Sequence, residues 1–147
     1  ESRWIILQPG QFVLSQEQNT ASLDSQKRRG FVNVENFDNS ILNEHINSFK
    51  NYGVVTGYGN LLVVDCDDTL SEELVENYLK ETFTVLTGSG KKHFYYICRN
   101  AKSIKIFKNN KKENFADIQY TGKQVIGAGS IHPNGNEYKV LKDNDVA

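Results

Sequence analysis

The chain has 147 residues, of which 38% are hydrophobic and 24% charged, and these proportions are typical of one globular domain and exclude a disordered chain. Lys and Arg number 17 and Asp and Glu 18, so the net charge of -1 confines any nucleic-acid contact to local patches. No apolar run approaches the roughly 20 residues of a membrane span, and two cysteines are too few for a disulfide framework or a multi-cysteine zinc site.

The first third of the chain mixes short apolar runs with polar stretches. Residues 4–13 predict two short strands separated by a Pro-Gly pair, and residues 16–29, which have no hydrophobic period, predict a surface loop. Apolar residues return at helical spacing over 40–50, behind capping residues, so we expect an amphipathic helix there.

The middle of the chain predicts two strands and a second helix. Residues 52–56 and 61–67 have strand character, and the glycine-containing turn between them predicts a tight hairpin. A capped amphipathic helix is expected over 69–80.

The remaining residues predict mainly strands. The lysine-rich segment 102–112 has little apolar content and predicts a loop or a frayed helix. Strands are expected at 83–87, 92–98, 115–120, 123–128 and 137–141. Many short strands and two helices indicate an α+β fold, with a largely antiparallel or mixed sheet and flanking helices.

Asp65 and Asp67 lie two residues apart at the end of an apolar strand, so their side chains share a face. Leu62, Val64 and Cys66 alternate with them and are expected to face the core, which leaves the acidic pair on an open face. Two carboxylates this close repel unless they are protonated or bridged by a cation, and they suit Mg²⁺ or Mn²⁺. The plainer interpretation, a turn that only caps the next helix, leaves Asp65 unexplained.

A third carboxylate, Asp117, lies in the strand expected at 115–120. If that strand lies beside the Asp65 strand, the three acids can hold two metal ions, the arrangement that stabilises attacking and leaving oxygens in phosphoryl and nucleotidyl transfer.

Two turns carry hydroxyl groups and cationic side chains. In the first, glycines free backbone amides, and Ser89, Lys91 and His93 add the hydroxyl and positive charge that a triphosphate requires. The second contains Ser130 and His132. Together with the strand carboxylates, these turns indicate a metal-dependent nucleotide site.

In this order, the segments 51–57, 62–67, 87–93, 117–119 and 129–138 resemble the bifunctional primase-polymerase domain of the archaeo-eukaryotic primase superfamily. The resemblance covers about residues 50–140 and implies that superfamily's RRM-like catalytic core. It departs from the family pattern at Lys91, where the family has a glycine, and at Ala128-Gly129, where the family has a proline pair.

The resemblance implies a role for each candidate residue. Asp65, Asp67 and Asp117 would form the catalytic triad that binds two Mg²⁺ or Mn²⁺ ions. His93 would contact the phosphates of the incoming nucleotide. Ser89, Lys91, Ser130 and His132 would line the same nucleotide pocket.

The implied activity is template-directed nucleotidyl transfer, as a DNA primase or DNA polymerase that makes or extends primers. Its partners would be nucleoside triphosphates, a single-stranded DNA template with its primer, and a helicase domain or subunit. We expect electrostatic, salt-sensitive template contact through Lys92, Lys102, Lys105 and Lys108. The chain has no methionine and no secretory signal, so we expect residues 1–147 to be a single catalytic domain excised from a larger, cytoplasmic replication protein without a membrane segment.

Two alternatives use the same residues. Residues 63–70 also look like the first motif of haloacid-dehalogenase-type phosphatases, with Asp65 as nucleophile and Asp67 as general acid/base, although the strand-dense second half leaves no room for the parallel crossovers such a fold needs. The second alternative is a non-catalytic nucleotide or nucleic-acid binding module. Joint binding of Mn²⁺ and a nucleoside triphosphate would favour a catalytic domain over such a module.

Overall fold

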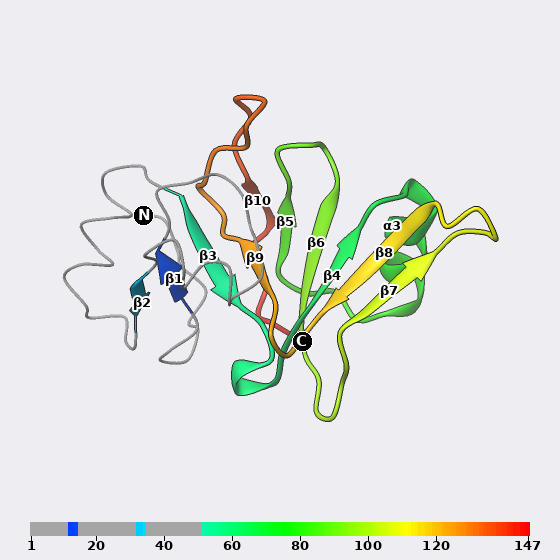
Figure 1. Ribbon diagram of the computed structural model, residues 1–147, viewed down its shortest axis with the longest axis horizontal. Helices are drawn as coiled ribbons and strands as arrows, with labels where there is room; N and C mark the ends of the chain where they lie inside the picture. The colour runs from blue at the N-terminus through cyan, green and yellow to red at the C-terminus, as the bar shows by residue number, and fades with distance from the viewer. Residues whose placement is uncertain (1–11, 15–31, 35–50) are drawn as a thin grey trace.

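The computed structural model describes residues 12–14, 32–34 and 51–147. The loop expected at 16–29, the helix expected at 40–50 and most of the segment 4–13 lie outside the described residues. Within the described part, two antiparallel sheets and one α-helix confirm the α+β class (Figure 1).

The larger sheet has six strands in the order β10-β5-β6-β4-β8-β7, and every neighbouring pair is antiparallel. The central strand, β4, is apolar on both faces, which suits a position between two buried layers. The strands are β4 (Leu61–Cys66), β5 (Thr84–Leu86), β6 (Lys92–Ile97), β7 (Ile104–Phe107), β8 (Asn114–Gln119) and β10 (Lys139–Lys142).

The smaller sheet has the order β2-β1-β3-β9 and is also antiparallel. Its strands are β1 (Phe12–Leu14), β2 (Val32–Val34), β3 (Tyr52–Val55) and β9 (Gln124–Ile126). Because β9 follows β8 in sequence, the chain leaves one sheet for the other between them and returns at β10.

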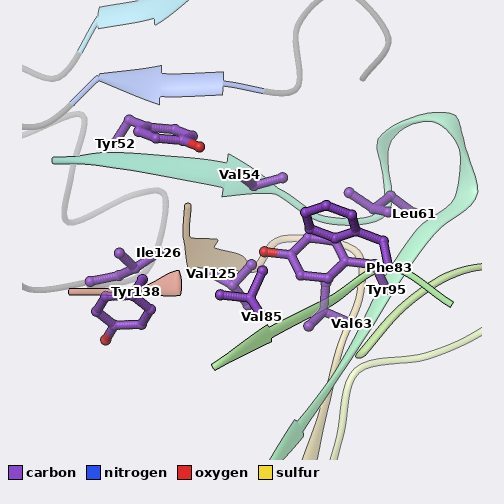
Figure 2. Packing of buried hydrophobic residues seen from close by; sticks show 10 residues of the cluster. All are labelled: Tyr52, Val54, Leu61, Val63, Phe83, Val85, Tyr95, Val125, Ile126 and Tyr138. Carbon is purple, nitrogen blue, oxygen red and sulfur yellow. The ribbon is translucent and has the colours of Figure 1, made fainter. Parts of the chain in front are cut away.

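The main core fills the space between the two sheets (Figure 2). Phe83 and Tyr95 pack edge to face there, with ring centroids 5.3 Å apart. The other buried members are Tyr52, Val54, Leu61, Val63, Val85, Val125, Ile126 and Tyr138.

A second core lies on the opposite face of the six-stranded sheet, under the helix α3 (Thr69–Tyr78). Val75 of α3 packs there against Leu62, Val64 and Cys66 of β4. The helix expected over 69–80 is therefore confirmed, and its N-cap is Asp68, whose carboxylate accepts the Leu70 N–H at 2.9 Å.

Two expectations for strands were wrong. β3 and β4 do not form a hairpin, because the short helix η1 (Tyr58–Asn60) carries the chain from one sheet into the other. The segment 102–112 is not a loop or frayed helix throughout, since it contains the edge strand β7. All four β7 residues are exposed and the strand pairs with β8, and the surrounding lysines mask its short alternation Ile104-Lys105-Ile106.

In the described part of the chain, no helix has the length and apolar character needed to cross a membrane.

Candidate active site

A row of charged and titratable side chains crosses four neighbouring strands of the larger sheet. Asp65 on β4 lies opposite His93 on β6 and opposite Asp117 on β8. Asp117 in turn lies opposite Lys105 on β7. Directly opposed residues of antiparallel strands share a face, so His93, Asp65, Asp117 and Lys105 form one line. The expected adjacency of the Asp65 and Asp117 strands is confirmed.

This face of β4 is not the open face that the strand alternation predicts. Leu61 and Val63 share it with Asp65, and both are fully buried in the core between the sheets. The alternation fails as a guide because both faces of the central strand are covered. Asp65 lies toward the end of the same strand, where its side chain is 27% exposed.

Asp67 completes an acidic cluster just beyond β4. Its backbone N–H donates to the Phe115 carbonyl at 3.0 Å, which ties it to the start of β8. Burial raises the pKa of Asp67, and the charges of Asp65 and Asp117 raise it further. Burial likewise raises the pKa of Asp117, Lys105 opposes that shift, and Asp65 adds to it. The three carboxylates are thus close enough to interact.

Asp65 is contacted on both of its oxygens. His93 Nε2 lies 3.1 Å from Asp65 Oδ1, and Gln119 Nε2 donates to Asp65 Oδ2 at 3.5 Å. His93 is only 6% exposed, and its Nδ1 is buried without a hydrogen-bond partner. The histidine is therefore held against the acidic cluster and keeps one ring nitrogen uncommitted.

A cavity of about 210 Å³ adjoins this cluster. Asp65, Cys66 and Asp67 form one part of its wall, and β9 with Tyr138 forms another. The β5–β6 hairpin contributes Thr87, Ser89, Lys91 and His93, and the sheet and β9 contribute Gln119 and Gln124. A second cavity of about 280 Å³, between α3 and β5–β6, lies on the other face of the sheet and is remote from the three aspartates.

The β5–β6 hairpin is pre-ordered at the cavity wall. Thr87 and Lys91 close the turn, with the Thr87 N–H donating to the Lys91 carbonyl at 2.7 Å. The Lys91 N–H donates to Thr87 Oγ1 at 3.0 Å, and the Thr87 and Ser89 hydroxyl oxygens lie 3.0 Å apart. The turn expected here is confirmed, and it places hydroxyls and a cation beside the carboxylates.

The donor set fits a divalent cation. Asp117 Oδ1 is buried without a hydrogen-bond partner, and carboxylate oxygens are the ligands that Mg²⁺ and Mn²⁺ prefer. As the side chains stand, no three His, Cys, Asp or Glu residues in the described ranges are arranged to hold one ion together. Coordination by the three aspartates therefore requires their side chains to rotate toward a common point.

Two of the expected nucleotide-binding residues do not line the cavity. Ser130 is fully buried, and its hydroxyl accepts the Tyr52 N–H at 3.2 Å. His132 packs over Gly88, and its Nδ1 accepts the Asn134 N–H at 3.1 Å. Both residues lie in the β9–β10 connection, of which Tyr138 lines the cavity.

The four expected template lysines have different surroundings. Lys92 Nζ lies 2.7 Å from Glu76 Oε1 of α3, on the face opposite the aspartates. Lys108 Nζ lies 2.9 Å from Asp68 Oδ2. Lys102 and Lys105 are exposed. The template role of all four stays a prediction.

Seven residues that line the cavity were not predicted as site residues, and the polar ones among them are Thr87, Gln119, Gln124 and Tyr138. The signal for Gln119 was present, because it lies two residues after Asp117 and so shares its face. For Gln124 and Tyr138 there was none, since their place depends on how the second sheet packs.

The model of the family described as bifunctional DNA primase/polymerase, N-terminal, matches residues 8–147. No curated protein matched the chain.

Proposed function

The chain belongs to the bifunctional DNA primase/polymerase family, and we propose that it catalyses template-directed nucleotidyl transfer with two Mg²⁺ or Mn²⁺ ions held by Asp65, Asp67 and Asp117. The observation that carries the proposal is the pairing of Asp65 with Asp117 on adjacent strands, beside a cavity that the β5–β6 hairpin lines. We propose further that the two sheets are the catalytic core of the archaeo-eukaryotic primase superfamily.

Each residue of the cluster has a part in this proposal. When bound, the two ions would lower the pKa of the attacking 3′-hydroxyl and neutralise the leaving pyrophosphate. Asp65, Asp67 and Asp117 would hold them with carboxylate oxygens. His93, which already contacts Asp65 Oδ1, would orient that carboxylate and add a donor for a phosphate oxygen.

The hairpin would receive the triphosphate. Ser89 and Lys91 line the cavity with a hydroxyl and a cation, and hydrogen bonds to Thr87 hold the Ser89 hydroxyl and the Lys91 backbone before a substrate arrives. Groups that are fixed in advance bind the triphosphate without first having to be ordered. The partners would be nucleoside triphosphates and a primed single-stranded DNA, with Lys102 and Lys105 as exposed cations for its phosphates.

The phosphatase alternative is not proposed. A nucleophilic aspartate of that type needs parallel strands joined by helical crossovers, and every strand pair described is antiparallel. The matching family model is also that of bifunctional DNA primase/polymerases and not that of a phosphatase.

A calorimetric titration tests the proposal against a non-catalytic binding module. Mn²⁺ is titrated into the protein with and without a non-hydrolysable nucleoside triphosphate. We expect the two ligands to strengthen each other's binding and Asp117→Asn to weaken Mn²⁺ binding at least tenfold. Asp143→Asn, the same change at an exposed position after β10, serves as control. Nucleotide binding that ignores Mn²⁺ would overturn the proposal and leave a binding module.

A further inference from the structure

The connection between β9 and β10, residues 127–138, joins the two sheets. It starts in the four-stranded sheet and ends in the six-stranded sheet, where β10 pairs with β5. Figure 1 shows this orange segment rising beside the green β5–β6 hairpin. We call residues 127–138 the bridging loop.

One side of the bridging loop is fixed to β3. Asn51 forms a two-way pair with Ile131, since its Nδ2 donates to the Ile131 carbonyl at 2.9 Å and its Oδ1 accepts the Ile131 N–H at 2.8 Å. The next residue, Tyr52, donates its N–H to the fully buried Ser130 hydroxyl. These bonds span about 80 residues of sequence and anchor the loop on the smaller sheet.

The other side of the bridging loop is hydrogen-bonded to the β5–β6 hairpin at Gly88. Asn134 Nδ2 and Asn136 Nδ2 both donate to the Gly88 carbonyl, at 2.9 and 3.0 Å. A carbonyl oxygen has two lone pairs and accepts both. A Cβ at position 88 would lie 2.1 Å from His132 Cβ, so the contact is too close for any residue but glycine.

Hydrogen bonds within the bridging loop stabilise its own conformation. The His132 N–H donates to the Asn136 carbonyl at 2.7 Å, and the Asn136 N–H donates to Asn134 Oδ1 at 2.9 Å. Within the cavity wall, the Tyr138 ring lies between two histidines, with ring centroids 6.0 Å from His132 and 6.2 Å from His93. The loop thus reaches the cavity wall directly through Tyr138 and indirectly through its hydrogen bonds to Gly88.

Gly88 stands between Thr87 and Ser89, which line the cavity. A shift of the Gly88 carbonyl therefore moves both hydroxyls and the Lys91 amide bonded to Thr87. We propose that the bridging loop is the positioning element of the triphosphate subsite: Asn134 and Asn136 set the hairpin through Gly88 and do not themselves touch the nucleotide. The inference rests on the proposed function, and it changes the expected roles of Ser130 and His132 from nucleotide contacts to supports.

The test compares the Asn134→Ala/Asn136→Ala double variant with the wild type in two measurements. The first is hydrogen exchange without nucleotide. Because the Gly90 N–H donates to the Thr87 carbonyl and the Lys91 N–H to Thr87 Oγ1, we expect both amides to exchange at least tenfold faster once the hairpin is released. Asn144→Ala, the same change at an exposed position, should leave them unaltered.

The second measurement is nucleotide use in primer extension. Loss of two hydrogen bonds to one carbonyl is expected to raise KM for the triphosphate roughly tenfold with little change in kcat, as for uniform binding. Affinity for the matching nucleoside monophosphate should stay the same, because it does not reach the hairpin subsite. Asn134→Ala alone leaves one donor to the Gly88 carbonyl, so we expect an intermediate rise in KM. This single variant replaces the double variant in the test if the double variant does not fold.

Three outcomes overturn the inference. Unchanged exchange at Gly90 and Lys91 would show that the loop does not hold the hairpin. An unchanged KM in a folded double variant would show that the hydrogen bonds from Asn134 and Asn136 to Gly88 do not affect nucleotide binding. An equal loss of monophosphate affinity would show that the asparagines bind the sugar or base directly. Failure of the proposed function is distinguishable, because the wild type itself would then neither extend primers nor bind nucleotide with Mn²⁺.

Discussion

At the scale of single residues, Asp65 is the centre of the candidate site. Its two oxygens are contacted by His93 and Gln119, and Asp117 lies opposite it on β8. These neutral or cationic donors partly offset the repulsion among the carboxylates. The cluster nevertheless retains unfavourable charge, because burial and neighbouring acids raise the pKa of Asp67 and of Asp117.

The raised pKa of Asp117 predicts a pH-dependent stability. A carboxyl whose pKa is higher in the folded state stabilises the fold below its unfolded value, here 3.8, and that contribution is lost as the pH rises through the folded value. Ionised Asp117 therefore destabilises the metal-free protein at neutral pH. We expect Asp117→Asn to raise Tm by a few degrees at pH 7.5 in EDTA, with the gain shrinking toward pH 4.

Thermal melts of both proteins from pH 4 to 8 check this prediction. Mn²⁺ should raise the Tm of the wild type more than that of the variant, because the cation replaces the missing countercharge. A variant that melts below the wild type at pH 7.5, or a gain that is the same at every pH, would contradict the account of the cluster.

Leu61 tests the packing beneath the site. It is fully buried between the sheets, and truncation of a buried leucine costs about 2–5 kcal/mol through lost transfer energy and a residual cavity. Urea denaturation of Leu61→Ala should show that loss in the free energy of unfolding. Leu141→Ala, at a position 46% exposed, should cost about 0.5 kcal/mol or less. Equal costs would argue against a core between the sheets.

At the scale of elements, the crossing between β3 and β4 determines which sheet each strand joins. Gly57 has a φ of 85°, and a Cβ there would lie 2.6 Å from the Thr121 Cα. Thr56 strengthens the same crossing, with its N–H donating to the Lys123 carbonyl at 3.0 Å. The turn is therefore packed against the β8–β9 connection, which brings β9 to the cavity.

Gly57→Ala should destabilise the protein through backbone strain at a positive φ and through steric overlap of the new Cβ with Thr121. Gly122→Ala is the matched control, because Gly122 also has a positive φ, 76°, but a Cβ there meets nothing within 4 Å. Backbone strain alone is worth about 1–3 kcal/mol. We expect Gly57→Ala to cost at least 1 kcal/mol more than Gly122→Ala in urea denaturation, and equal effects would show that the Thr121 contact is unimportant.

The elements also show what a sequence pattern can and cannot predict. Strand positions follow from alternation and turns, and so β4, β6 and β8 were located correctly. The partner of each strand was less predictable, because β3 and β4 are joined by a turn suited to a hairpin yet pair with distant strands. The exposed edge strand β7 was missed because its short apolar alternation lies within a lysine-rich segment.

The site was predictable to a similar degree. The spacing of Asp65 and Asp67 and the in-strand position of Asp117 identified the carboxylates. The interaction of His93 with Asp65 needed the strand pairing, and the contact of Asn134 and Asn136 with Gly88 needed the arrangement of both sheets. Long-range register is set by packing, and no local pattern contains it.

At the scale of the whole molecule, two sheets meet over one core and leave a cavity where the acidic cluster, the hairpin and β9 come together. The net charge of -1 gives no general attraction for DNA. Catalysis by this domain would therefore depend on local charge, namely bound cations at the aspartates and exposed lysines for the template.

Primer extension on a single-stranded DNA template tests the central claim most directly. The assay compares the wild type with Asp65→Asn/Asp67→Asn and with the control Asp143→Asn/Asp145→Asn, which makes the same charge change at exposed positions. We predict products from the wild type and the control only with Mg²⁺ or Mn²⁺ present, and no detectable product from the Asp65/Asp67 variant. Extension by that variant at the wild-type rate, or extension by the wild type in EDTA, would contradict the account.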